Sequence, residues 1–376
     1  MALIPSFPDV HFGYGALSEL ASELARRGID RPLILTDAGL VKAGVCQKVC
    51  DALAPGARAA MFDGIPENPT IGGVERALVA YRAGACNGIV AVGGGSVLDS
   101  GKALRILARQ GGSLLEYLDD PGKISPEVAP LITIPTTAGT GAEVTFGGGI
   151  HPEPNAPALG IRSTYARPDL AICDPELTLS LPPRLTAATG MDALTHCVEG
   201  FLSTRENPPT KAIALDGIAR VVRNVGRATA DGQDREARWH MLMAALQGGM
   251  SIYLGLGPIH ALSMAFGDSP LHHGTLVTVA MPAVMRFYNG LEGDRLQRIA
   301  AAMNLEADRD AGNRIADAVA RMNADLGLPA SVRQMGYRKT DVGRMAEEAR
   351  RAYFNLTAPR QPTREEYARL VVEVLG

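Results

Sequence analysis

The chain has 376 residues, of which 46% are hydrophobic and 20% are charged, and its formal net charge is −3. This composition is typical of a globular protein of two domains, and a near-neutral charge without a basic run argues against a nucleic-acid partner. No apolar stretch reaches the roughly 18 residues that a membrane-spanning helix needs, and the start of the chain lacks a signal-peptide pattern. Five scattered cysteines predict no disulfide framework, so we expect a cytoplasmic protein with small, buried thiols.

The first half of the chain alternates short apolar runs with segments of helical character. The predicted strands are 31–37, 57–63, 87–93, 130–135 and 170–174, and the predicted helices include 70–84 and 96–109. Strands that alternate with helices predict a parallel sheet, and near-continuous apolar character indicates that both of its faces are covered.

From about residue 179 onward the sequence contains no convincing strand. Apolar residues from Ile315 to Leu326 repeat at helical spacing before Gly327, and Thr363 with Glu366 forms a capping-box pattern that opens a last helix. We therefore predict an α/β domain over residues 1–178 and an all-helical domain over residues 179–376.

A glycine-rich loop follows the predicted strand 87–93, in the stretch AVGGGSVLDSGK at 91–102. Glycines permit close approach of the backbone to a ligand, and the free N–H groups at a helix start attract phosphate. The stretch is neither the GxGxxG fingerprint nor a Walker A loop, so a tight turn without a ligand is an equal alternative.

Two further loops stand at predicted strand ends. Asp37 could accept a hydrogen bond from a ribose hydroxyl, or it could simply cap a helix. Thr136, Thr137 and Thr140 lie among glycines and could line a ligand, or form a polar turn. Three such loops together favour a nucleotide-binding crevice at the carboxyl ends of the strands.

Asp192 and His196 are four residues apart in GMDALTHCVEG, so on a helix they share one face. They could be two metal ligands, or a hydrogen-bonded pair on the helix surface. Later histidines could complete a site of one carboxylate and three imidazoles, which suits Fe²⁺, Zn²⁺, Ni²⁺ or Co²⁺ better than Mg²⁺ or Ca²⁺. The later histidines are too distant in sequence for spacing to show that they converge.

Several motifs together resemble the iron-containing, group III alcohol dehydrogenases. They are GGGSVLDSGK, PTTAGTGAEVT, LPPRLTAATGMDALTHCVEGF, GLGPIHALS and HHGTLVTVAMPAVMRF, and they are spread along nearly the whole chain. The stretches LHHGTL and VRQMG are most similar to the 4-hydroxybutyrate dehydrogenase branch. The resemblance implies a dehydroquinate synthase-like fold, with an α/β nucleotide-binding domain, an all-helical domain and the active site in the cleft between them.

The resemblance also implies the site residues. The metal ligands, and with them the catalytic centre, would be Asp192, His196, His260 and His273, where His273 is preferred to His272 because it directly precedes Gly274. The residues that would bind the cofactor are Asp37, Asn68, Gly94, Gly95, Ser96, Asp99, Thr136, Thr137, Thr140 and Leu177. An aspartate at position 37 implies NAD, because its charge would repel the extra phosphate of NADP. The metal would be Fe²⁺, with Zn²⁺ as the alternative.

The chain departs from its relatives around this site. Ala158 stands where many relatives carry a lysine, and Met264 where many carry a histidine that could relay a proton. His272 could replace that histidine. Arg162 and His151 could bind an anionic substrate, although a surface role is an equal alternative for each.

The expected activity is hydride transfer between NAD(H) and a small primary alcohol or aldehyde, including an anionic pair such as 4-hydroxybutyrate and succinic semialdehyde. The alternative is a dehydroquinate synthase-like or glycerol dehydrogenase-like enzyme that acts on a polyol or sugar phosphate. A third possibility is a protein that kept the fold without catalysis, which the complete acid-and-histidine set argues against. The resemblance further implies a homodimer. The near-neutral charge and the lack of a long apolar stretch predict neither a nucleic-acid partner nor a membrane partner.

Overall fold

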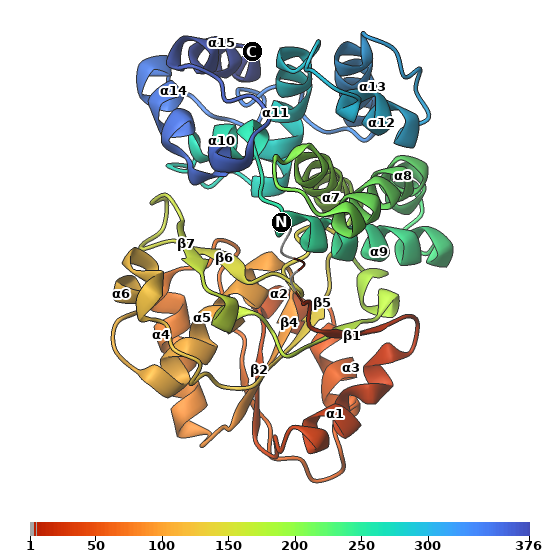
Figure 1. The fold of residues 1–376 in the computed structure, drawn as a ribbon. Coiled ribbons are helices and arrows are strands. Elements are labelled where there is room, and N and C mark those ends of the chain that lie inside the picture. Colours follow the sequence, from red (N-terminus) through yellow and green to blue (C-terminus); the bar gives the residue numbers. More distant parts are fainter. Residues whose placement is uncertain (1–3, 5) are drawn as a thin grey trace. The chain divides into compact units, whose positions relative to one another are not determined.

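The computed structural model describes residue 4 and residues 6–376, so the predicted lack of a signal peptide concerns a segment that lies partly outside the described residues. Two compact units make up the fold (Figure 1). The α/β unit comprises Ser6–Thr137 and Ala142–Ser180, and the helical unit includes Ala138–Gly141 and Leu181–Gly376. The boundary at residue 178 stays a prediction.

A six-stranded sheet forms the centre of the α/β unit, and every pair of neighbouring strands is parallel. Its spatial order is β1-β8-β5-β4-β2-β3. The strands are β1 (Asp9–Phe12), β2 (Pro32–Leu35), β3 (Ala60–Phe62), β4 (Gly88–Gly93), β5 (Leu131–Pro135) and β8 (Leu170–Cys173). All five predicted strands are present; β1 was missed because its sequence, DVHF, is not a buried apolar run.

Helices cover both faces of this sheet because successive side chains of a strand point to opposite faces. Leu33, Ile89 and Leu131 pack on the side of α4, α5 and α6, whereas the neighbouring Ile34 and Val90 pack on the side of α1 and α3. The helices are α1 (Leu20–Arg26), α2 (Ala38–Lys42), α3 (Val45–Asp51), α4 (Ile71–Ala83), α5 (Gly95–Gln110) and α6 (Leu114–Asp119). Short 3-10 segments are η1 (Ala16–Glu19), η2 (Pro121–Lys123), η3 (Thr164–Ala166) and η4 (Pro175–Thr178).

A small antiparallel hairpin, β6 (Gly147–Ile150) with β7 (Leu159–Arg162), is joined to α5 through a buried lysine. Lys102 Nζ donates to Asp99 Oδ1 at 3.0 Å, to Thr145 Oγ1 at 2.9 Å and to the Gly147 carbonyl at 2.6 Å. Asp99 Oδ2 in turn accepts the Gly149 N–H at 2.9 Å. The hairpin was not predicted, because the three glycines of β6 give no strand signal.

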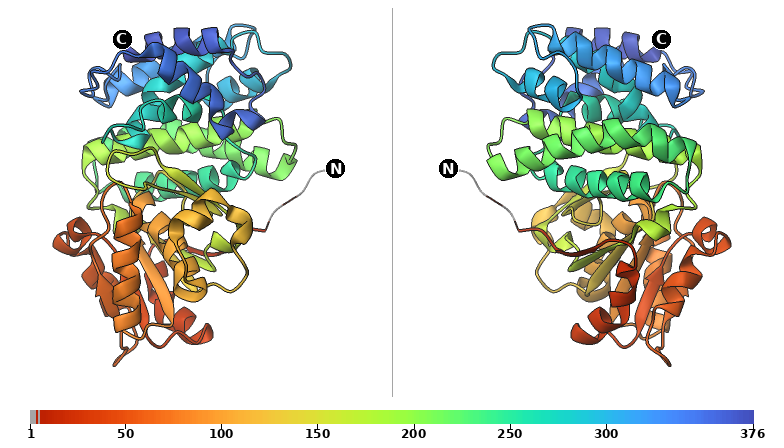
Figure 2. Two further views of the ribbon diagram at one scale, coloured as in Figure 1. Left: turned by 90° about the vertical axis from the view of Figure 1, so that its left-hand side faces the viewer. Right: turned by 90° about the vertical axis from the view of Figure 1, so that its right-hand side faces the viewer.

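The helical unit contains no strand among its described residues, as the sequence predicted. Its helices are α7 (Pro183–Leu202), α8 (Pro208–Ala230), α9 (Arg235–Ile252), α10 (Pro258–Met264), α11 (His273–Phe287), α12 (Arg295–Ala302), α13 (Ala311–Asp325), α14 (Val342–Arg351) and α15 (Arg364–Leu375), with η5 (Tyr353–Thr357). α7, α8 and α9 pack side by side (Figure 2), and α11 packs on both α7 and α13. Every residue of α7 from Thr186 to Leu202 is buried, so α7 is the central helix of this unit.

Local signals read from the sequence are present in the helical unit. α13 ends before Gly327, which has a φ of +67°, and the Thr363–Glu366 capping box opens α15.

Within the same unit Gly141, at a φ of +62°, lies so close to Gly249 that an added Cβ would be 2.3 Å from the Gly249 Cα. A side chain at position 141 is therefore excluded by both the backbone conformation and the space.

None of the helices in the described part of the chain is long and apolar enough to cross a membrane. The five cysteines are free thiols, and four of them are buried, as the sequence predicted. Cys50 is half-buried, so the prediction of a buried thiol is wrong at that position.

Candidate metal centre and nucleotide loops

The central helix α7 presents an acid and an imidazole within the interior of the helical unit. Asp192 is 2% exposed and His196 is 5% exposed, and the His196 Nε2 lies 3.7 Å from the Asp192 Oδ1. The alternative of a hydrogen-bonded pair on the helix surface is therefore wrong. Ionisable groups in a fully buried helix carry a cost in free energy unless they are paired, so they indicate a functional role.

The next helices bring two further histidines to this pair. His260 lies in α10 and His273 is the first residue of α11. One possible ligand atom from each of Asp192, His260 and His273 lies within 4.8 Å of the others. The ring of His196 stacks on that of His260, with centroids 4.9 Å apart, so all four residues predicted from the motifs are close together.

Three of these side chains hold buried atoms with no hydrogen-bond partner, namely Asp192 Oδ1, His196 Nδ1 and His260 Nε2. An unsatisfied buried polar group costs about 1–3 kcal/mol, so retaining three of them in one place requires compensation. A divalent cation would provide it, because it accepts lone pairs from a carboxylate and imidazoles together. The residues present therefore fit a metal ion of the Fe²⁺ or Zn²⁺ type.

Burial keeps His260 in the form that a metal ligand needs. It lowers the pKa of His260 to about 3, with the neighbouring His196 acting in the same direction. His260 is therefore neutral near pH 7, and only a neutral imidazole has a lone pair to give.

Glu199 is a member of this cluster that our sequence reasoning missed. It is 2% exposed, its Oε2 lies 2.6 Å from the His260 Nδ1, and its Oε1 accepts the Ile259 N–H at 2.7 Å. Burial raises the pKa of Glu199 to about 7, although hydrogen bonds from backbone N–H groups oppose the shift. Its spacing gave a usable signal: Glu199 follows Asp192 by seven positions, two helical turns along the same face.

The glycine loop of the α/β unit lies at the carboxyl end of β4, directly before α5. The Thr136 N–H donates to the Gly93 carbonyl at 3.0 Å, so the glycine and threonine loops are in contact. An added Cβ on Gly94 would lie 3.2 Å from the Thr137 Cγ2, so the loop leaves little room for a side chain there. The first N–H groups of α5 have no partner inside their own helix, which suits a phosphate.

The other residues predicted to bind the cofactor have structural roles as well. Asp37 caps α2, where its Oδ1 accepts the Leu40 N–H at 3.0 Å, which is the alternative that the sequence left open. Ser96 Oγ donates to the Glu67 carbonyl, and Asp99 Oδ2 accepts the Gly149 N–H of the β6–β7 hairpin.

The remaining predicted cofactor residues belong to both units. They are half-buried Asn68 and Gly95, buried Leu177 in η4, and Thr140, which belongs to the helical unit. A cofactor role for each stays a prediction.

The candidates for substrate binding fall into two pairs. Exposed Arg162 ends β7, and the His151 Nδ1 lies 2.5 Å from the Ala156 carbonyl; both residues belong to the α/β unit, as does Ala158 directly before β7. Met264 is the last residue of α10, and the His272 side chain caps α11 by accepting the Thr275 N–H at 3.3 Å. A substrate role for them stays a prediction.

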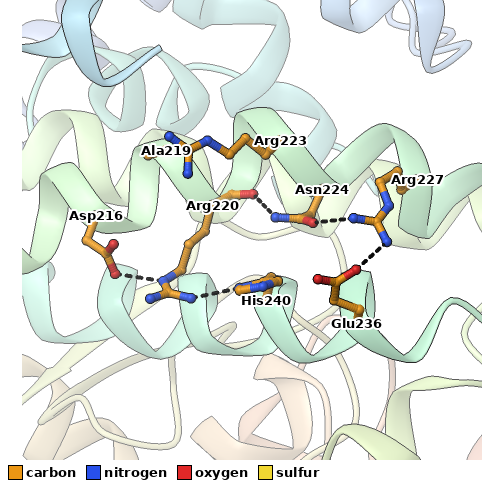
Figure 3. A pocket seen from close by; sticks show the side chains of 8 residues that line it. All are labelled: Asp216, Ala219, Arg220, Arg223, Asn224, Arg227, Glu236 and His240. Atoms are coloured by element: carbon orange, nitrogen blue, oxygen red, sulfur yellow. Dashed lines mark hydrogen bonds and ion pairs between the residues drawn. The ribbon is translucent and has the colours of Figure 1, made fainter. Parts of the chain in front are cut away.

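A separate polar cavity of about 290 Å³ lies between α8 and α9 (Figure 3). Arg220 bonds to Asp216 and to His240 there, and Arg227 bonds to Glu236. None of the predicted site residues lines it, and most of its charges are paired within it, so we assign it no role in catalysis.

The sequence of the chain matches a known protein family in both of its halves. Residues 8–175 match the iron-containing alcohol dehydrogenase family, and residues 186–375 match the C-terminal part of that family. The chain is 44% identical over an alignment of 384 positions to a 4-hydroxybutyrate dehydrogenase from Cupriavidus necator, which covers 99% of both chains.

Solved structures agree with the family match. A 1,3-propanediol oxidoreductase is 32% identical, with a TM-score of 0.94 and coverage of 100% of both chains. A sulfoacetaldehyde reductase from Bifidobacterium kashiwanohense, solved in complex with NAD⁺, is 26% identical with a TM-score of 0.91, and covers 100% of this chain and 99% of its own. The predicted family, fold class and likeness to 4-hydroxybutyrate dehydrogenase are confirmed. The chain belongs to the iron-containing alcohol dehydrogenase family, and it is an NAD-dependent alcohol dehydrogenase.

Proposed function

We propose that Asp192, His196, His260 and His273 bind the catalytic divalent metal, and that this metal is Fe²⁺, with Zn²⁺ as the alternative. The observation that carries the proposal is the pair of unpaired buried atoms, Asp192 Oδ1 and His260 Nε2, in a cluster whose ligand atoms lie within 4.8 Å of one another. A metal bound there supplies Lewis acidity, which lowers the pKa of an alcohol and polarises the carbonyl of an aldehyde.

The protein's own contribution is to prepare the ligands before any substrate arrives. α7 fixes Asp192 and His196 on one face, and burial keeps His260 neutral. Asp192, His196 and His260 are buried, whereas His273 is exposed. Electrostatic interactions among the three buried side chains are therefore stronger than in solvent. None of the four side chains is required to act as a nucleophile.

The cofactor role of the glycine and threonine loops is part of the same proposal. Gly94 and Gly95 would allow the dinucleotide phosphates to approach the start of α5, and Asp37 would contact the ribose with the carboxylate oxygen that does not cap α2. The family match and the tight packing of Gly94 on Thr137 support this role.

For the substrate we propose 4-hydroxybutyrate, which would be oxidised by NAD⁺ to succinic semialdehyde with release of NADH and a proton. The support is the 44% identity to a 4-hydroxybutyrate dehydrogenase over 99% of the chain. The substrate carboxylate needs a cationic partner, and Arg162 is our candidate. We also propose a homodimer, which a measurement of molar mass in solution would test.

The test is a panel of aldehydes with NADH after reconstitution with Fe²⁺ or Zn²⁺. Succinic semialdehyde should give the highest kcat/KM, and butanal, which lacks the carboxylate, should be turned over at least about 10-fold less efficiently because an ion pair of about 1.4 kcal/mol is lost. Arg162→Ala should remove this preference without affecting butanal. Equal kcat/KM for both aldehydes would refute the anionic substrate, and a protein that binds metal and NADH without net NADH turnover would favour a dehydroquinate synthase-like reaction.

A further inference from the structure

We infer that Glu199 is the positioning residue of the metal site: it holds the proton of His260 on Nδ1 and so leaves the Nε2 lone pair free for the cation. The inference rests on the proposed metal site, and it concerns how that site is prepared in the metal-free protein. Glu199 would thus act through His260 and would not itself touch the metal or the substrate.

Both oxygens of Glu199 are committed to fixed donors. Oε1 accepts the backbone N–H of Ile259 at 2.7 Å, and Oε2 faces the His260 Nδ1 at 2.6 Å. A backbone N–H cannot give up its proton, so Oε1 has only one possible role. Ionised Glu199 has no proton to donate, so in that form the hydrogen bond between Oε2 and the neutral ring requires the proton on Nδ1. His260 Nε2, which is buried and unpaired, is left without a proton.

The backbone around Glu199 is shaped to admit the carboxylate. An added Cβ on Gly257 would lie 2.9 Å from the Glu199 Oε1, so a side chain there would displace the oxygen that meets Ile259. Glu199 itself is 2% exposed, so water has little access to replace either hydrogen bond.

His196 shows what the absence of such an acid means. Its Nδ1 is buried and has no hydrogen-bond partner, although its ring stacks on that of His260. One carboxylate therefore orients only one of the two stacked imidazoles. Acids that accept the remote N–H of a ligating histidine fix the tautomer and the ring orientation in known metal sites.

Glu199→Gln is a sharp test because it changes the donor pattern with little change in volume. The amide has one acceptor oxygen for two donors, the Ile259 N–H and the His260 Nδ1–H. The conflict is relieved when the amide NH₂ faces His260 and the ring moves its proton to Nε2. That tautomer has no lone pair directed at the cation, so the variant should bind metal roughly 10- to 100-fold more weakly.

The primary measurement is the tautomer of His260 in the metal-free protein, read from long-range ¹H–¹⁵N correlation spectra of ¹⁵N-histidine-labelled protein and assigned with His260→Ala. We expect the Nδ1–H form in the unsubstituted protein and the Nε2–H form in Glu199→Gln. The Nε2–H form in the unsubstituted protein would overturn the inference even if the variant failed to fold.

The second measurement is the affinity for Zn²⁺ or Co²⁺ in competition with a chelator. Glu143→Gln is the matched control, because Glu143 is also a buried glutamate at 2% exposure but belongs to the α/β unit. It should bind metal like the unsubstituted protein. Unchanged affinity in Glu199→Gln, with weakened binding in His260→Ala, would refute the role of Glu199 and leave the proposed metal site intact. Unchanged affinity in His260→Ala would refute the metal site itself.

Discussion

The two units of the molecule use their predicted site residues in different ways. In the α/β unit, Asp37, Ser96 and Asp99 already bond to other parts of the protein. In the helical unit, Asp192 and His260 keep buried atoms without a partner. The α/β unit has one such buried atom among its described acids, the Glu143 Oε1, and burial raises the pKa of that group to about 7, which favours its neutral form.

The difference follows from the ligands that each unit is expected to bind. Phosphate is bound largely by backbone N–H groups, so the site needs glycines and a helix start, while the side chains nearby remain available for structural bonds. A cation needs lone pairs, and those must be kept unpaired in the folded protein at a cost in stability. A metal site is therefore recognised by buried ligand atoms that have no hydrogen-bond partner. A phosphate site is recognised by glycines beside free backbone N–H groups.

The strongest test of this comparison is Asp192→Asn, which removes a ligand charge and keeps the volume. Reduction of aldehyde by NADH should fall about 1,000-fold, since Lewis acid catalysis is worth several kcal/mol and each 1.36 kcal/mol is tenfold. The metal-free variant should be no less stable in thermal unfolding, because an unpaired buried carboxylate is lost. The matched control is Asp216→Asn, whose carboxylate bonds to Gln247 and Arg220 and should not affect turnover. Full metal content and turnover in Asp192→Asn would contradict the assignment.

An intermediate effect is expected for Gly94→Ala in the phosphate loop. The added methyl group would lie 3.2 Å from the Thr137 Cγ2 and would occupy space that the cofactor needs. We expect the Kd for NADH to rise about 10-fold, equivalent to about 1.4 kcal/mol, with unchanged metal content. Fluorescence titration with NADH measures this change.

Gly226→Ala is the matched control for that substitution. A Cβ on Gly226 meets no atom within 4 Å, and Gly226 lies within α8, where alanine is favoured over glycine by about 1 kcal/mol. This variant should be slightly more stable and bind NADH normally. If Gly94→Ala behaved in the same way, the glycine loop would not be a phosphate site.

The smallest effect concerns Asp268, an acid of the helical unit that is fully paired, unlike Asp192. It accepts bonds from the Tyr337 hydroxyl at 3.1 Å, Lys339 at 2.7 Å and Arg344 at 3.1 Å. Burial acts to raise the pKa of Asp268, but the bonds from Lys339 and Tyr337 outweigh it and lower that pKa. Asp268→Asn should cost about 1 kcal/mol or less at neutral pH, because the network is partly exposed.

The sign of the pH dependence follows from the lowered pKa. The stability that Asp268 contributes is present above the ordinary aspartate pKa near 3.8 and is lost as the pH falls through the lower folded-state value. Chemical denaturation of both proteins from pH 7 down to pH 3 should show their difference in unfolding free energy shrinking toward the acid end. A difference that grows in acid would contradict this pairing.

Sequence patterns predicted most of the fold because buried strands and helix faces require apolar residues at regular positions in the sequence. The apolar runs located β2, β3, β4, β5 and β8, and helical spacing with Gly327 located the end of α13. The hairpin β6–β7 escaped prediction because its strand identity depends on packing against α5 through Asp99 and Lys102, which no local pattern records.

The candidate site was predictable in part. The spacing of Asp192 and His196 indicated a shared helical face, but only the family resemblance connected them with His260 and His273, which lie more than 60 residues further along the chain. Local spacing cannot report a contact between separate helices. Glu199 could have been found from its position on the same face, yet a lone glutamate in a helix is ordinarily a solvated charge.

The close approach of Gly141 to Gly249 bears on how such a protein can be recombined. Ala138–Gly141 belongs to the helical unit, although both flanking segments belong to the α/β unit. The helical half is therefore not inherited as one uninterrupted stretch, and a chimera joined only at residue 180 would combine a loop from one parent with a helix from the other. Exchange of domains between relatives would have to carry this loop together with α9, or keep glycine at both positions.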